Sequence, residues 1–151
     1  YLSKTDRLNS IILSESSFFS NGIIPEVTKF LQIAQTCSKQ LSDFIIKTKK
    51  SGLDVWCYTC PAKATTLIST LSEESRSSIS FIVDDSVLKA SKYLPGLGIP
   101  IISMQNARKC IKKQSAVIIL AWNIAESLVQ NLRDENFELQ IYRPLPTLVA
   151  L

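Results

Sequence analysis

LDVWCYTCPAKATTLISTL, residues 53–71, places an apolar run directly before a helical pattern. Leu53–Tyr58 is almost continuously apolar and short, which predicts a buried strand, and Ala62–Leu71 predicts a helix. A strand that leads through a short loop into a helix is the opening of a β-α-β unit, in which the next strand runs parallel to the first. The stretch therefore indicates an α/β fold.

The same alternation continues on both sides of this stretch. Pro25–Lys49 predicts one long helix, because its apolar residues recur at steps of three and four. Further strands are expected at Ile79–Val83, Ile99–Ile102, Ala116–Ala121 and Phe137–Tyr142, and further helices at Met104–Lys113 and Ile124–Arg133. The pattern predicts a Rossmann-like, mostly parallel sheet of about five strands with helices on both faces, preceded by a long N-terminal helix.

The chain has 151 residues, which suits one domain. Residues 1–22 are rich in Ser and Asn and are interpreted as a linker or arm, and residues 23–151 as the folded domain. Because the chain begins at Tyr1 rather than Met, we expect it to be part of a longer protein.

Composition excludes several classes of function. A balance of 17 basic and 13 acidic residues gives +4, too small and too scattered to predict nucleic-acid binding. The absence of histidine excludes histidine acid–base chemistry and histidine metal sites within the chain. No apolar run approaches the ~18 residues that a membrane span needs. With no visible signal peptide, we expect a cytoplasmic protein with reduced thiols.

Trp56-Cys57-x-x-Cys60, followed later by Gly98-Ile99-Pro100, is also how a thioredoxin-like redox site is written. Two features oppose that interpretation. Cys57 falls inside the predicted strand, and the chain after Pro100 predicts helix, strand, helix and strand rather than an antiparallel hairpin. A thioredoxin-like oxidoreductase stays as a second alternative, and a four-cysteine zinc site is disfavoured because only one close pair exists.

Parallel sheets bind ligands beyond the carboxyl ends of their strands. Four segments are expected at that edge: Tyr58–Lys63, Asp84–Gly98, Trp122–Asn123 and Tyr142–Pro146.

Three motifs in these segments resemble one family. Residues 58–68, YTCPAKATTLI, resemble the YGAPAKGNTLL loop in the C-terminal domain of nucleotide-sugar C-methyltransferases that use S-adenosylmethionine (SAM). Residues 83–89 (VDDSVLK), 92–96 (KYLPG) and 99–101 (IPI) follow the family's Asp, Lys, Tyr-x-Pro-Gly and Ile-Pro-Ile order. Residues 120–123, LAWN, are close to its Leu-Pro-Trp-Asn. The resemblance covers residues 23–151.

The resemblance implies a modular enzyme in deoxysugar biosynthesis. A zinc-binding domain and a SAM-binding methyltransferase domain with the catalytic residues would precede this chain. The chain itself would bind no cofactor and would be non-catalytic alone. Its partners would be a dTDP-sugar-like nucleotide-sugar and the methyltransferase domain of the same polypeptide, with no nucleic acid and no membrane. The first alternative is a Rossmann-like interdomain scaffold that has lost its ligand.

The chain departs from the family at informative positions. Thr59 and Ala64 replace its two glycines, Thr65 replaces its Asn, and Ser86-Val87 replaces Asn-Pro. Glycine allows positive φ and a close approach of backbone to phosphate, so side chains at Thr59 and Ala64 are expected to restrict that approach.

The candidate substrate-binding residues each carry a second interpretation. Lys63 is expected to pair with a diphosphate, or else is a solvated lysine of the first helical turn. Tyr58 is expected to stack on the ligand or to pack in the core. Thr65 is included because it stands where the family has Asn.

The remaining candidates follow later strands. Asp84 is expected to accept a hydrogen bond from a sugar hydroxyl, or to cap the next turn together with Asp85. Lys89 and Tyr93 match the family or are solvated surface residues. Asn123 is a substrate candidate, although N-capping of the helix from Ile124 is the favoured interpretation.

Overall fold

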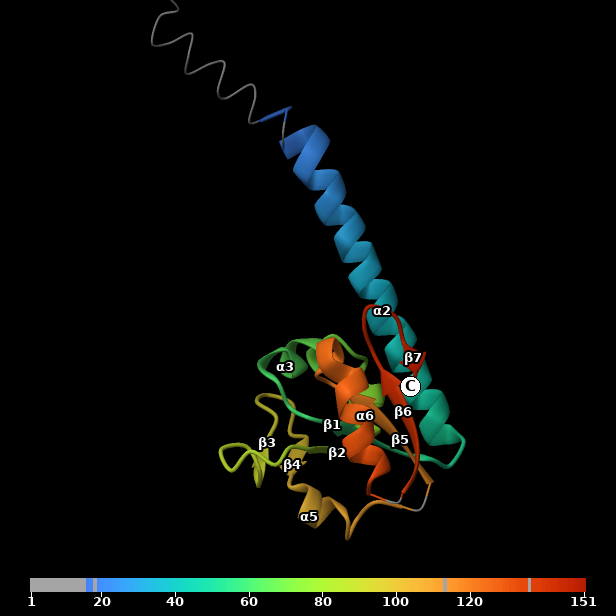
Figure 1. Cartoon of the computed structure of the whole chain (residues 1–151). Helices are drawn as coiled ribbons and strands as arrows, with labels where there is room; N and C mark the ends of the chain where they lie inside the picture. Colours follow the sequence, from blue (N-terminus) through green and yellow to red (C-terminus); the bar gives the residue numbers. More distant parts are fainter. Residues whose placement is uncertain (1–15, 18, 113, 136) are drawn as a thin grey trace, which may run out of the picture. The chain divides into compact units, whose positions relative to one another are not determined.

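The computed structural model describes residues 16–17, 19–112, 114–135 and 137–151 (Figure 1). Two compact units make up the chain, Tyr1–Thr36 and Cys37–Leu151. Most of the predicted arm, residues 1–22, therefore lies outside the described residues.

The described part of the first unit is helical. A π-helical turn, η1 (Phe19–Ile23), leads directly into α2 (Ile24–Lys50), which continues into the second unit. Lys47, Lys49 and Lys50 lie in the last turn of α2. Their positive charges oppose the partial negative charge at the carboxyl end of the helix, which favours the helix. The prediction of one long helix over Pro25–Lys49 is confirmed.

The second unit is built on a seven-stranded sheet in the order β3-β4-β2-β1-β5-β6-β7. The strands are β1 (Asp54–Tyr58), β2 (Ile79–Val83), β3 (Lys92–Tyr93), β4 (Pro100–Ile102), β5 (Gln114–Ile119), β6 (Glu138–Arg143) and β7 (Val149–Ala150). Strands β4, β2, β1, β5 and β6 run parallel to their neighbours in this series. Tyr58 pairs with Val83 and with Ile119, so the carboxyl ends of β1, β2 and β5 meet at one edge.

The sheet is mixed, which corrects the prediction of a mostly parallel sheet of about five strands. The predicted strands are present, but β3 pairs antiparallel with β4, and β7 pairs antiparallel with β6. Each of these edge strands has two residues. A strand this short cannot show an alternating or continuous apolar pattern, so hydrophobicity carries no signal for it.

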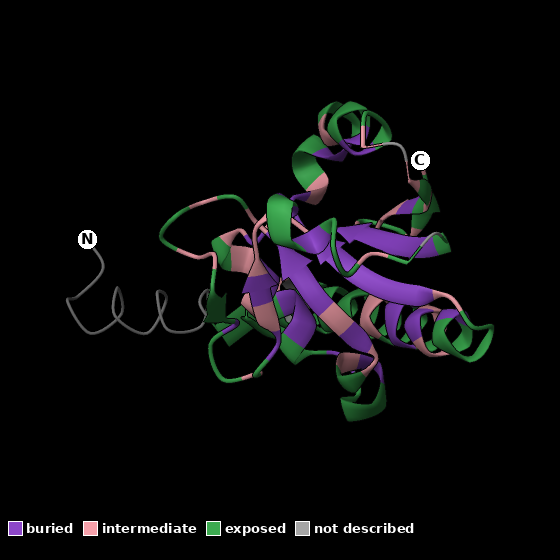
Figure 2. Ribbon diagram, turned by 90° about the horizontal axis from the view of Figure 1, so that it is seen from below, coloured by how far each residue is buried: buried purple, intermediate pink, exposed green. Residues whose placement is uncertain are grey.

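Apolar side chains are buried on both faces of the sheet, and the central strands are almost entirely purple in Figure 2. On one face, Val55 and Cys57 pack with α2 and α3 (Ala62–Ser69). On the other face, Trp56 packs with α5 (Met104–Ala107) and α6 (Ala125–Arg133). Side chains of a strand alternate between its faces, so a continuously apolar strand needs cover on both. The predicted helices on both faces are confirmed.

The shorter helices differ from the predicted boundaries. A five-residue helix, α4 (Glu73–Ser77), follows α3 and was not predicted. Its N-cap, Ser72, accepts a hydrogen bond from the Ser75 N–H. Helix α5 ends at Ala107 instead of Lys113, because the N–H groups of Lys109 and Cys110 bond to carbonyls three residues back. Such tightening ends an α-helix.

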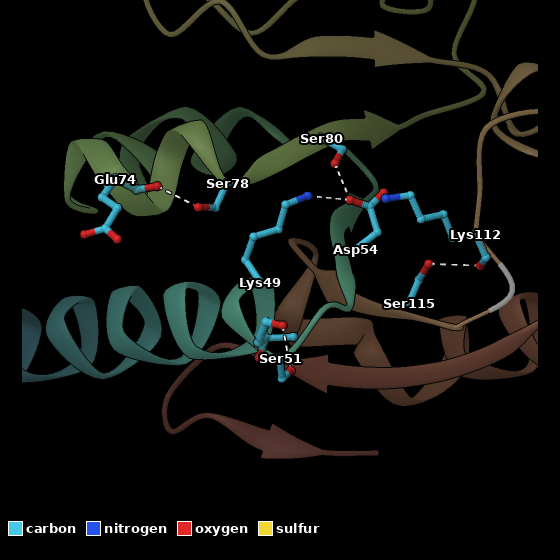
Figure 3. A network of polar contacts seen from close by, with 9 residues as sticks. Lys49, Ser51, Asp54, Glu74, Ser78, Ser80, Lys112 and Ser115 are labelled. Atoms are coloured by element: carbon cyan, nitrogen blue, oxygen red, sulfur yellow. Dashed lines mark hydrogen bonds and ion pairs between the residues drawn. The ribbon is translucent and has the colours of Figure 1, made fainter.

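Asp54 anchors the amino edge of the sheet, opposite the edge where a ligand is expected. Its Oδ1 accepts hydrogen bonds from Lys49 Nζ and Ser80 Oγ, both at 2.7 Å. Figure 3 shows the Lys112 ammonium directed toward the same carboxylate. Burial acts to raise the pKa of Asp54, but the hydrogen bonds from Lys49 and Ser80 and the two lysine charges outweigh it and hold the pKa below its ordinary value.

Candidate ligand-binding site

Loops from three parallel strands meet at the carboxyl edge. The loop after β1 leads through Pro61 into α3, the loop after β2 begins at Asp84, and β5 leads into η2 (Trp122–Ile124). The N–H of Thr59 donates to Val83 O at 2.7 Å, and the N–H of Leu120 donates to Tyr58 O at 2.9 Å. These bonds extend the strand pairing beyond the sheet, so the three loops start from fixed positions.

Lys63 is held between two residues of η2. Its Nζ donates to Asn123 Oδ1 at 2.5 Å and lies 3.9 Å from the centroid of the Trp122 ring. A cation over an indole face is attracted by the negative face of the ring. An ammonium has three donors and only one reaches Asn123, so Lys63 keeps donors for an anion.

Asn123 does not cap α6, which makes the capping interpretation wrong. The N-cap of α6 is Ile124, whose apolar side chain makes no cap hydrogen bond. Asn123 lies one residue earlier, within the η2 turn. The Asn123 side-chain oxygen instead accepts a hydrogen bond from the Lys63 ammonium on α3.

The α3 N-terminus lies next to Lys63. In the described part of the chain no side chain caps this helix at Pro61, and the Ala64 N–H of the first turn bonds to Pro61 O at 2.8 Å. The first N–H groups of a helix have no intrahelical partner, and they attract anions when no side chain satisfies them. The α3 N-terminus, the Lys63 ammonium and the Trp122–Asn123 turn therefore form an anion-attracting site, which we call the Lys63 corner.

Asp84 is already surrounded by donors. Its Oδ2 accepts from the Cys60 N–H at 2.7 Å and from Lys89 Nζ at 3.1 Å, and its Oδ1 accepts from the Ser86 N–H at 3.0 Å. The bond from Ser86 closes the turn that the second interpretation of Asp84 predicts. Asp84 thus pins the loop after β2 to the loop after β1.

Asp85 has a different structural role from its neighbour. Its Oδ1 accepts from the Met104 N–H at 2.7 Å, at the first residue of α5. It therefore satisfies a helix N-terminus 19 residues away, rather than the adjacent turn.

Tyr58 and Lys63 face opposite sides of the sheet. The Tyr58 ring packs against the cluster beneath α5 and α6, whereas Trp122 packs against the cluster beneath α2 and α3. Burial raises the pKa of Tyr58, and a hydrogen bond with Asn131 of α6 acts in the opposite direction. Thus Tyr58 has the packing role that was its second interpretation.

Thr65 and Tyr93 lie apart from the contacts described so far. Thr65 is half-buried on α3, and Tyr93 is 67% exposed on the edge strand β3. Among the described residues, no hydrogen bond or ion pair joins either of them to Lys63 or Asp84. Geometry brings together Lys63 with Asn123, and Asp84 with Lys89, out of the seven candidates.

The two neighbouring cysteines have the opposite properties to those of a redox dithiol. Cys57 is 1% exposed and lies in the core between β1 and the helices on that face. Burial raises the pKa of the Cys57 thiol, and burial followed by the nearby Asp84 charge raises that of Cys60. A redox pair needs a lowered thiol pKa, so the thioredoxin-like alternative loses its physical basis.

Two features of this site were not predicted from the sequence. Trp122–Asn123 was expected at this edge of the sheet, but the contact between the Trp122 ring and the Lys63 ammonium was not predicted. The Thr59 side chain was expected only to restrict the approach of a phosphate, yet its hydroxyl donates to Tyr58 O and accepts from the Ala121 N–H. No pattern in the sequence indicates these two hydrogen bonds.

A separate hollow of about 380 Å³ lies at the amino ends of β2 and β4 and is lined by residues such as Arg76, Ile79 and Pro100. It contains none of the seven candidate residues. Among the described residues, no group of three potential metal ligands gathers anywhere. No helix in that part of the chain is both long and apolar enough to cross a membrane.

Comparison with known proteins assigns the chain to a family. A family model described as the C-methyltransferase C-terminal domain matches residues 3–146, nearly the whole chain. No curated protein matches the sequence.

Proposed function

Since this chain belongs to the family of C-methyltransferase C-terminal domains, we propose that it holds the nucleotide-sugar substrate of a SAM-dependent sugar C-methyltransferase. The observation that carries the proposal is the Lys63 corner. There an ammonium, an uncapped helix N-terminus and an indole ring lie together at the carboxyl edge of a parallel sheet. This is the edge at which such sheets bind nucleotides.

The diphosphate is the part of a nucleotide-sugar that this corner suits. Lys63 supplies a point charge, and the first N–H groups of α3 supply aligned donors of the same sign. The Asn123 amide holds Lys63 in place before a ligand arrives, which lowers the entropy cost of binding.

The chain would act as one part of a modular enzyme. On the basis of its family, we propose that other domains of the polypeptide hold SAM, zinc and the catalytic groups, and that the methyltransferase domain is the partner of this one. The four free cysteines favour a reducing compartment, and we place the protein in the cytoplasm.

One observation favours the alternative of a ligand-free scaffold. The Asp84 carboxylate takes the Cys60 N–H, a donor that stands at the entrance to α3. A carboxylate at this position competes with a bound phosphate by occupying a donor and by repelling its charge.

A titration separates the two functions. Thymidine diphosphate added to the 151-residue chain should shift the NMR signals of Lys63 and Trp122, and thymidine alone should bind more weakly. Lys63→Met should weaken diphosphate binding roughly 10-fold or more, since a charge-assisted hydrogen bond contributes about 1.5–3 kcal/mol. Lys47→Met on the exposed face of α2 is the matched control and should leave binding unchanged. No shift at millimolar thymidine diphosphate would favour the scaffold.

A further inference from the structure

Thr59 has a backbone conformation that its residue type disfavours. Its φ is +64°, in the left-handed region. A β-branched residue is a genuine outlier there, whereas glycine enters the region freely. Such a conformation persists only where the surroundings impose it, and it clusters at binding sites.

The Thr59 side chain adds one rung to the pairing of β1 and β5. Leu120 N–H donates to Tyr58 O, which is ordinary strand pairing. Beyond Tyr58 the strand pairing ends, and the Thr59 hydroxyl adds a side-chain bond between the two strand ends by accepting from the Ala121 N–H at 3.1 Å. The same hydroxyl donates to Tyr58 O at 2.6 Å, which fixes its orientation.

Thr59 consequently bonds to both neighbours of β1. Its N–H holds the end of β2 through Val83 O, and its hydroxyl holds the residue before Trp122 on the β5 side. The two halves of the Lys63 corner begin immediately beyond these bonds, with Pro61 and α3 on one side and Trp122 and Asn123 on the other.

From this geometry we infer that Thr59 is a positioning residue: its hydroxyl sets the spacing between Lys63 and the Trp122–Asn123 turn, and thereby prepares the anion site. The expected effect on ligand binding rests on the proposed function, whereas the effect on the spacing of the loops rests only on the contacts of Thr59. The Thr59 side chain is bonded to the strand end through Tyr58 O. The loop therefore has the positive φ that is typical of glycine, but not the conformational freedom of a glycine.

Three substitutions separate the hydroxyl from the backbone conformation. Thr59→Val removes the hydroxyl and keeps the β-branch, Thr59→Ser keeps the hydroxyl, and Thr59→Gly removes the hydroxyl while relieving the disfavoured φ. Thr66→Val on the exposed side of α3 is the matched control. Hydrogen exchange of the Ala121 amide and the nuclear Overhauser contact between Lys63 and Trp122 are measured without ligand, and thymidine diphosphate is then titrated.

In Thr59→Val we expect Ala121 exchange to speed up and thymidine diphosphate affinity to fall, each by roughly 3- to 10-fold, as for the loss of one hydrogen bond. The Lys63–Trp122 contact should weaken in the same variant. Thr59→Ser should stay within about 2-fold of the unchanged chain on every measurement. Thr59→Gly should resemble Thr59→Val and decides the question if the valine variant fails to fold.

An intact Lys63–Trp122 contact and undiminished affinity in folded Thr59→Val or Thr59→Gly overturn the inference, as does a serine variant that loses both. If the unchanged chain binds no thymidine diphosphate, the proposed function fails. The ligand-free contact between Lys63 and Trp122 then still decides whether Thr59 positions the corner.

Discussion

Lys63 and Asn123, 60 residues apart in the chain, meet at the carboxyl edge of the sheet with Nζ and Oδ1 2.5 Å apart. The contact joins the loop after β1 to the loop after β5. It leaves the lysine charge uncompensated, because a neutral amide rather than a carboxylate holds it.

That neutrality can be tested by Asn123→Asp, which keeps the shape and adds a charge. We expect thymidine diphosphate affinity to fall roughly 10-fold or more, because the carboxylate neutralises Lys63 and repels the ligand. Stability should change by less than ~1 kcal/mol, since the pair is exposed and screened. Asn123→Ala is the control and should reduce affinity less than the aspartate does. Equal affinities for the two variants would show that the Lys63 charge is not used.

The Asp84–Lys89 ion pair should stabilise the loop after β2. The Asp84 side chain is 11% exposed and that of Lys89 is 42% exposed. Asp84→Asn should lower the free energy of unfolding by about 1–3 kcal/mol, because a charged acceptor of three hydrogen bonds is lost. Lys89→Met should cost less. A double-mutant cycle by urea unfolding should give a coupling of about 0.5–1 kcal/mol, and additive effects would mean that the pair contributes nothing.

Asp54 should make the fold sensitive to acid. Its folded-state pKa lies below the ordinary value of 3.8, so its contribution is present above that value. The contribution disappears as pH falls through the folded pKa, because the unfolded chain then binds the proton more readily. Urea unfolding between pH 7 and pH 2 should show a loss that begins near pH 4, and Asp54→Asn should reduce it.

Asp43→Asn is the matched control for this loss, because Asp43 is an exposed acid on α2. It should leave the acid limb of the stability curve unchanged. An identical limb in Asp54→Asn and in the unchanged chain would exclude Asp54 as its source.

Thiol reactivity should rank the cysteines by exposure. Cys110 is exposed, and Cys57 and Cys60 are buried with raised pKa values. With iodoacetamide at pH 7.5, mass spectrometry should show Cys110 modified first and Cys57 modified only on unfolding. Rapid modification of Cys57 or Cys60 in the folded protein would revive the redox alternative.

Local patterns were sufficient for much of the fold. The bounds of Ile79–Val83 were predicted as they are found in β2, and the long helix differs by one residue at each end. Both are long or strongly apolar, so their own residues determine them. The two-residue strands β3 and β7 form only because β4 and β6 offer free edges, and no local pattern can express that.

For the candidate site too, some features were predictable from the local sequence and others depended on tertiary contacts. Sequence placed Lys63 in the first turn of a helix that follows a strand, and the motif that contains it resembles the C-methyltransferase C-terminal domain to which the chain belongs. Tertiary structure decided the partners of Lys63, which are the Asn123 amide and the Trp122 ring. It also decided that Asn123 does not cap a helix and that Tyr58 packs on the opposite face of the sheet. It also decided that Thr59 adopts a φ of +64°. Strand and helix periodicity are properties of neighbouring residues, whereas these contacts join segments that only the formation of the sheet brings together.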